Sequence, residues 1–228
     1  MQVETGFGKV KEFLGSLDLE GNLTLFKGRS CYDILYNTLV RDLSKEKAIV
    51  ASSNNLDYID ILKAARKSNK SGIRCVKDKI KICRAFTAYQ LLEILENKIK
   101  NEEYDQLFLV EPGYLFLDEE IPMDEGRSLL RDGISCLSRD CEKKTKTGVI
   151  VSDDSKFSDI LSDFVDNKII FSQIRDGIKV KYGEKVFTFD TSVKQRQATM
   201  DYYIRKLGVE DVDLFVRKQK NLTDFVGG

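Results

Sequence analysis

The residues best placed to do chemistry stand in a segment that begins at Gly28, directly after an apolar run. A phosphate-binding loop has the pattern Gly-x-x-x-x-Gly-Lys-Ser/Thr between a strand and a helix. Its glycines let backbone N–H groups wrap the phosphates, its lysine neutralises charge and its hydroxyl group ligates magnesium. The spacing is kept here, but Asp33, Ile34 and Leu35 replace the second glycine, the lysine and the hydroxyl residue. Because aspartate repels phosphate and isoleucine carries no charge, we predict a degenerate loop that does not support nucleotide hydrolysis.

Two other roles are open to the same segment. Ser30, followed three residues later by Asp33, predicts a helix start that caps itself, each side chain compensating the exposed backbone amides. Alternatively, Lys27, Arg29 and Ser30 are candidates for binding an anion at this helix start, because helix N-termini attract negative charge. In this second role the protein would be a regulator that responds to a nucleotide or another anion and binds it without hydrolysing it.

Other catalytic chemistry is restricted by composition. The chain has 0 histidines, which removes Ser-His and Cys-His catalysis. Its 5 cysteines are an odd number without C-x-x-C spacing, so we expect buried, reduced thiols and no metal site. A bridge between Cys75 and Cys83 requires that the flanking segments form a hairpin. We predict no catalytic residue and no cofactor.

The elements that must position this loop alternate between strand-like and helix-like patterns. Near-continuous apolar strands between amphipathic helices predict an α/β fold, with a mostly parallel sheet covered on both faces. Thr87, followed three residues later by Gln90, predicts a capping box at one helix start. The predicted strands are 22–27, 48–52, 79–85, 106–110 and 148–152, and the predicted helices are 32–43, 56–68, 88–100, 123–141 and 157–164.

The pattern changes after the last of these helices. Segments 168–175, 178–181 and 185–189, separated by Asp176-Gly177 and Tyr182-Gly183, predict a small antiparallel meander, since Asp-Gly is a strong hairpin signal. Helical patterns follow at 192–207 and 209–220. We therefore predict a core domain over 1–190 and a C-terminal helical extension over 191–228, packed on the core or available to a partner.

Charge and hydropathy indicate no membrane partner. Lys+Arg and Asp+Glu number 37 each, so no global field attracts the chain to nucleic acid or membrane. The longest nearly apolar run, 107–117, includes Glu111 and is far shorter than the roughly 20 residues of a membrane helix. Charged residues interrupt the first part of the chain, where a signal peptide has its apolar core. A soluble, cytoplasmic protein is expected.

Several segments together resemble the RecA/RadA recombinase superfamily, with a KaiC/RadB-like core ATPase fold. The resemblance covers roughly 4–190 and implies a RecA-like sheet and a setting in DNA recombination or repair. It also identifies the Gly28 segment as a degenerate Walker A motif. The segments that carry it are Thr5-Gly6-Phe7, Leu14-Gly15, the run 21–28 and the run 82–92, which reads as a strand entering a capped helix.

The departures from the family pattern are consistent with one another. No carboxylate stands near Ser52-Ser53-Asn54, where the family places its catalytic glutamate. An acid is kept only at the Walker B-like position, where Glu111 stands in place of the family's magnesium-linked aspartate. A lone glutamate at a strand end is more often a solvated or paired charge than a metal ligand. The family's Phe-x-x-Ala polymerisation motif does not occur in the sequence. The resemblance therefore implies a non-catalytic paralogue, an accessory or scaffold protein whose partner is a protein, with a recombinase as one candidate.

Weak or no DNA binding is expected. In the resembled family, loops after the third and fourth core strands grip DNA, but here 102–125 contains nine acidic residues and no Lys or Arg, which repels phosphate. A basic surface is predicted elsewhere, because 168–206 holds nine basic and four acidic residues. The alternative is a solvated strand face with ordinary charge scatter. The candidate DNA-binding residues are Lys179, Lys181, Lys185, Lys194 and Arg196.

Overall fold

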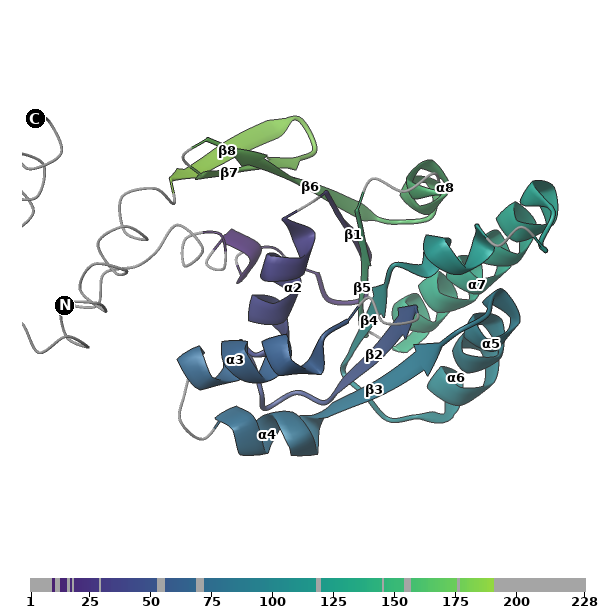
Figure 1. The fold of residues 1–228 in the computed structure, drawn as a ribbon, viewed down its shortest axis with the longest axis horizontal. Coiled ribbons are helices and arrows are strands. Elements are labelled where there is room, and N and C mark those ends of the chain that lie inside the picture. Colours follow the sequence, from purple (N-terminus) through teal and green to yellow (C-terminus); the bar gives the residue numbers. More distant parts are fainter. Residues whose placement is uncertain are drawn as a thin grey trace, which may run out of the picture.

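The computed structural model describes residues 10, 13–15, 17, 19–28, 30–52, 56–68, 72–117, 120–144, 146–153, 157–175 and 177–190. Its centre is an 8-stranded sheet with the strand order β3-β2-β4-β5-β1-β6-β7-β8 (Figure 1). The C-terminal extension that we predicted over 191–228 lies outside the described residues, as do Lys194 and Arg196.

The sheet is parallel except at one end. Strands β1 to β6 run parallel to their neighbours, and β7 and β8 continue from β6 as an antiparallel meander. The predicted α/β class, mostly parallel sheet and terminal meander are confirmed. The strands are β1 Leu23–Lys27, β2 Lys47–Ser52, β3 Ile80–Ala85, β4 Gln106–Val110, β5 Thr147–Ser152, β6 Asn167–Ile174, β7 Gly177–Tyr182 and β8 Lys185–Asp190.

Helices cover both faces of the parallel part (Figure 1). One face carries α2 (Cys31–Leu39), α3 (Tyr58–Ser68) and α4 (Gly72–Lys79). The other face carries α5 (Ala88–Glu93), which continues through a π-helical turn η1 (Ile94–Lys98) into α6 (Ile99–Asn101), together with α7 (Met123–Lys144) and α8 (Ser158–Asp163). A short 3-10 helix, η2 (Pro112–Phe116), follows β4.

The central strands bury both of their faces, because successive side chains of a strand point to opposite sides. Phe26 and Ile49 pack into the core under α2 to α4, whereas their neighbours Leu25 and Val50 pack into the core under α5 to α8. All four side chains are 0% exposed. This explains why β1 and β2 read in the sequence as continuous apolar runs.

The chain connections leave the carboxyl ends of β1 and β5 in opposite directions. From β1 the chain continues through α2 on one face toward β2, and from β5 it continues through α8 on the other face toward β6. Ligands of α/β sheets bind where adjacent strands send their connections in opposite directions. The segment that begins at Gly28 lies at this point of the fold.

Gly28 fixes the turn from β1 into α2. Its φ is 109°, and a Cβ built on it would lie 2.1 Å from the main-chain oxygen of Phe171 in β6. Its N–H donates to the Ser152 carbonyl at 3.1 Å, and its own carbonyl accepts from the Cys31 N–H at 2.9 Å. The close approach of two backbones therefore requires a residue without a side chain.

We expect Gly28→Ala to lower the free energy of unfolding by roughly 3 kcal/mol, because strained backbone and a clash with a main-chain oxygen add together. Gly183→Ala is the matched control: Gly183 also has a positive φ, 57°, but a Cβ there meets nothing within 4 Å. Its cost should be about 1 kcal/mol. Urea denaturation measures both, and equal costs for the two variants would show that the contact with Phe171 has no energetic effect.

Candidate functional site

Buried polar side chains gather at the carboxyl edge of the sheet. Ser52, Glu111 and Ser152 are each 0% exposed, and Ser30 is 5% exposed. Ser52 and Ser152 end β2 and β5, Glu111 follows β4, and Ser30 follows the turn after β1. Polar groups at the ends of four neighbouring strands are expected of a former or present binding site rather than of an ordinary core.

The Gly28 segment does not form an open phosphate loop. Helix α2 begins at Cys31, inside the eight-residue pattern, so the Ile34 N–H donates to the Ser30 carbonyl at 3.4 Å. Ile34 and Leu35, at the lysine and hydroxyl positions, are 1% and 0% exposed in the core, while Asp33 is exposed. The positions that would contact phosphate and magnesium are used for packing α2 onto the sheet.

The predicted self-capping of α2 by Ser30 is wrong. Ser30 precedes the helix, but its side chain makes no capping hydrogen bond, and its φ of -88° and ψ of 2° differ from the extended backbone of a capping residue. Of the other candidate anion-binding residues, Lys27 is half-buried at the end of β1, and Arg29 lies outside the described residues.

Glu111 is the most constrained side chain at this edge. Its backbone is left-handed, with φ 51° and ψ 48°, a conformation that non-glycine residues seldom adopt. One carboxyl oxygen, Oε1, accepts from the Tyr32 hydroxyl at 3.0 Å and from the Asp153 N–H at 2.6 Å. The other, Oε2, accepts from the Ser152 hydroxyl at 3.3 Å. Donors from α2 and from the end of β5 thus occupy both oxygens.

Burial raises the pKa of Glu111 from its usual 4.5 to about 7, because desolvation disfavours the charged form and the nearby Asp153 carboxylate repels it. The hydrogen bonds from the Asp153 amide, Tyr32 and Ser152 oppose this shift. The same burial and the charge of Glu111 raise the pKa of the Cys31 thiol to about 12 and hold the pKa of Tyr32 well above its usual range. Near neutral pH the site can therefore gain or lose a proton at Glu111, but it presents no thiolate.

The hydrogen bonds of Glu111 also bear on metal binding. Both carboxyl oxygens already accept from protein donors, so ligation of a cation by Glu111 would require part of this network to rearrange. Within the described parts of the chain, no group of three or more Cys, Asp or Glu residues is placed to hold a metal ion. All five cysteines are free thiols, so Cys75 and Cys83 do not form a bridge.

The structure separates the candidate DNA-binding lysines. Lys179 and Lys181 are both exposed and point to the same side of β7, opposite Ser172 and Ile170 of β6. Lys185 is paired with Tyr182 and therefore projects on the other side of the meander. Only Lys179 and Lys181 form a common surface among the described candidates.

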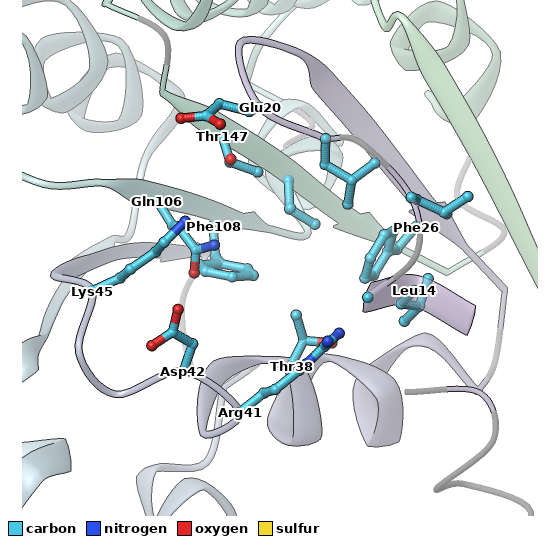
Figure 2. A pocket seen from close by; sticks show the side chains of 14 residues that line it. Leu14, Glu20, Phe26, Thr38, Arg41, Asp42, Lys45, Gln106, Phe108 and Thr147 are labelled. Atoms are coloured by element: carbon cyan, nitrogen blue, oxygen red, sulfur yellow. The ribbon is translucent and has the colours of Figure 1, made fainter. Parts of the chain in front are cut away.

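Sequence reasoning missed a cavity at the opposite, amino edge of the sheet. It has a volume of about 290 Å³ and lies between the starts of β4 and β5 and the C-terminal end of α2. Figure 2 shows Phe26 and Phe108 facing its interior, with Arg41 and Asp42 along its lower rim. The rim therefore carries both signs of charge over an apolar wall, and no residue spacing in the sequence signals this arrangement.

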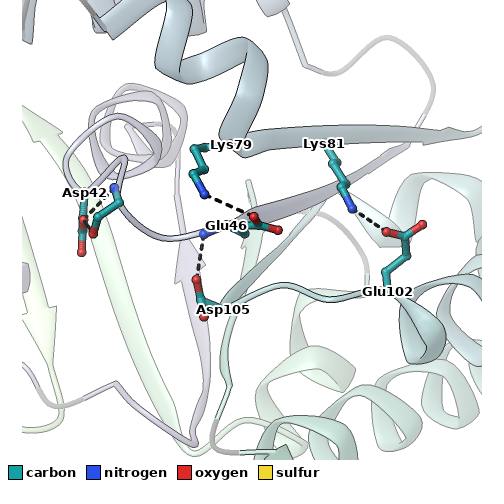
Figure 3. A network of polar contacts seen from close by, with 7 residues as sticks. Asp42, Glu46, Lys79, Lys81, Glu102 and Asp105 are labelled. Atoms are coloured by element: carbon teal, nitrogen blue, oxygen red, sulfur yellow. Dashed lines mark hydrogen bonds and ion pairs between the residues drawn. The ribbon is translucent and has the colours of Figure 1, made fainter.

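The amino edge near β2 is held by exposed polar contacts (Figure 3). The Glu46 carboxylate forms an ion pair with the Lys79 ammonium group at 3.2 Å. The Glu46 backbone N–H donates to the Asp105 carboxylate at 2.7 Å. Lys81 pairs with Glu102 at 2.7 Å. Because these side chains are solvated, the ion pairs add little to stability, and this network is an ordinary surface feature.

Comparison with known proteins assigns the chain to no family. The chain matches no protein-family model and no curated protein. No helix among the described residues is long and apolar enough to cross a membrane. The class that the structure defines is an α/β protein with a mostly parallel, helix-covered sheet and a terminal antiparallel meander.

The raised pKa of Glu111 predicts a pH-dependent stability. The folded state holds its proton up to about pH 7, whereas the unfolded state releases it near 4.5, so stability falls as pH rises through this window. Glu111→Gln should abolish this loss of stability. Its free energy of unfolding should exceed that of the wild type by roughly 3 kcal/mol at pH 8 and differ little at pH 4. Urea titrations across pH measure the effect.

The matched control is Glu96→Gln, which removes the same charge from an exposed position on η1. We expect it to leave the slope of stability against pH unchanged. Parallel slopes for the wild type and Glu111→Gln would contradict the assignment of a buried, protonated Glu111.

Proposed function

We propose that this chain is a non-catalytic RecA/RadA-like paralogue, an accessory or scaffold protein in DNA recombination or repair that does not hydrolyse ATP. One observation carries the proposal: Ile34 and Leu35, at the lysine and hydroxyl positions of the loop, are buried in the core. While α2 is packed on the sheet, these two positions face the core and cannot present an ammonium group or a hydroxyl to a nucleotide.

The Glu111 network supports the loss of hydrolysis. Tyr32 and Ser152 donate to the acid that stands at the Walker B-like position. To ligate magnesium, this buried carboxyl group would have to give up hydrogen bonds that join α2 to the end of β5. The site is therefore closed by its own side chains.

The setting in recombination or repair rests on the sequence resemblance. A RecA-like assignment agrees with the parallel sheet, the terminal meander and the location of the Gly28 segment at the carboxyl edge. With catalysis lost, the fold acts through contacts with a protein partner, for which a recombinase of the same cell is the first candidate. An anion-responsive regulator has less support, because the Cys31 and Ile34 amides already donate to main-chain carbonyls.

We expect no magnesium-dependent ATP turnover and no change of Tm with ATP, ADP or phosphate. A ligand at 100 times its Kd would add roughly 2.7 kcal/mol, which a thermal-shift assay detects. The matched control is Asp33→Ala, an exposed position of the loop, prepared in the same way. Magnesium-dependent turnover that co-purifies with the wild type, or that changes with this substitution, would contradict the proposal, whereas turnover that further purification removes identifies a contaminating ATPase.

For DNA, we expect weak, salt-sensitive binding of a short single strand, measured by fluorescence anisotropy at about 50 and 200 mM salt. The double variant Lys179→Ala/Lys181→Ala should remove it, because these side chains share one face of β7. Lys185→Ala, on the other face, should leave it unchanged. Equal loss with Lys185→Ala would contradict a one-sided surface.

A further inference from the structure

Two large aromatic side chains are held outside the core at the start of α5. Phe86 is 60% exposed and Tyr89 is 57% exposed. Half of the predicted capping box is present: Thr87 Oγ1 accepts from the Gln90 N–H at 3.2 Å. Gln90 Oε1 accepts instead from the N–H of Phe86, the residue before the cap, at 2.9 Å. The turn that presents both rings is therefore fixed by hydrogen bonds.

Phe86 has no visible role in folding. The residue before a capping residue often packs against the fourth residue of the helix as a hydrophobic staple. Here the fourth helix residue, Leu91, is buried in the core, whereas Phe86, the residue before the cap, remains in solvent. A rigidly presented aromatic side chain that does not pack internally marks an interaction surface.

Neighbouring elements extend this surface. The Tyr89 hydroxyl donates to Glu125 in the first turn of α7 at 3.0 Å, which joins the starts of α5 and α7. Met123, at the same end of α7, is 44% exposed, and Tyr114 on η2 is 46% exposed. Since η2 contacts both α5 and α7, these side chains belong to one end of the molecule. We call Phe86, Tyr89, Tyr114 and Met123 the aromatic platform.

The surroundings of the aromatic platform are acidic. Asp124 and Glu125 are exposed beside Met123, and the charges of Asp153 and Glu111 raise the pKa of Tyr114. Glu120, three residues before Met123, is also exposed. Of the nearby basic residues, Arg84 donates to the Leu56 carbonyl at 3.1 Å, and Arg127 lies one turn farther along α7.

We propose that the aromatic platform is the docking surface for an arginine-containing basic segment of a partner protein. A guanidinium group stacks on the faces of Phe and Tyr and forms paired hydrogen bonds with carboxylates, so one side chain uses both features of the surface. The inference rests on the proposed function, in which the chain acts through protein contacts, and names the chemistry of that partner. Single-stranded nucleic acid also stacks on aromatic rings, but the acidic surroundings repel its phosphates.

The test is a selection of random peptides displayed on phage against the full-length wild-type protein, with removal of peptides that also bind Phe86→Ala/Tyr89→Ala. Selected peptides are synthesised, labelled with fluorescein and titrated by anisotropy. The expected peptides contain arginine beside apolar residues. Phe86→Ala and Tyr89→Ala should each weaken their binding about tenfold. Glu125→Gln should weaken it about threefold and reduce its salt dependence.

Ile59→Ala is the matched control, because Ile59 is 59% exposed on α3, away from the aromatic platform. It should change the affinity less than twofold, and all variants should keep the wild-type Tm. The inference is overturned if no selected peptide depends on Phe86 or Tyr89, if the dependent peptides lack arginine, or if a single-stranded oligonucleotide displaces them. ATP hydrolysis by the wild type would instead refute the proposed function and leave the peptide result intact.

Discussion

The carboxyl group of Glu111 organises the carboxyl edge of the sheet, because a polar group that is 0% exposed must find its partners inside the protein. Its partners come from α2 through Tyr32 and from the end of β5 through Ser152 and the Asp153 amide. The contact with Tyr32 joins positions 79 apart in the sequence. One buried acid at the end of β4 thereby connects α2 to the end of β5.

The turn at Gly28 imposes a complementary constraint. It brings the backbone of β1 against that of β6, and α2 begins three residues later, so Ile34 and Leu35 turn inward to the core. A longer loop would free these residues and also remove the Tyr32 hydroxyl from Glu111. The short turn at Gly28 therefore accounts both for the packing of Ile34 and Leu35 in the core and for the hydrogen bond between Tyr32 and Glu111.

Features with local causes could be predicted from the sequence. Apolar runs gave the strands, the Thr87 and Gln90 pair gave the cap of α5, and Asp33, Ile34 and Leu35 indicated a loop without phosphate ligands. Two helical segments, α4 and η2, were missed. The former is short and follows 56–68 closely in a lysine-rich stretch, and the latter is a short 3-10 helix that starts at Pro112 directly after an apolar strand.

Features with distant causes could not be predicted. The burial of Glu111 depends on Tyr32, and the failure of Ser30 to cap α2 depends on the close turn at Gly28. The separation of Lys185 from Lys179 and Lys181 depends on strand register, since a shift by one residue exchanges the two faces. The exposure of Phe86 could not be predicted either, because phenylalanine is usually buried.

The burial of Ile34 and Leu35 also affects which sequence changes selection can accept. A single replacement of Ile34 by lysine would place an unpaired charge in a dry core and cost several kcal/mol, a large share of the stability of a typical domain. Leu35, Asp33 and the partners of Glu111 would have to change with it before any nucleotide could compensate. The closed loop and a phosphate-binding loop are thus separated by destabilised intermediates, and selection for stability opposes each single step from one to the other.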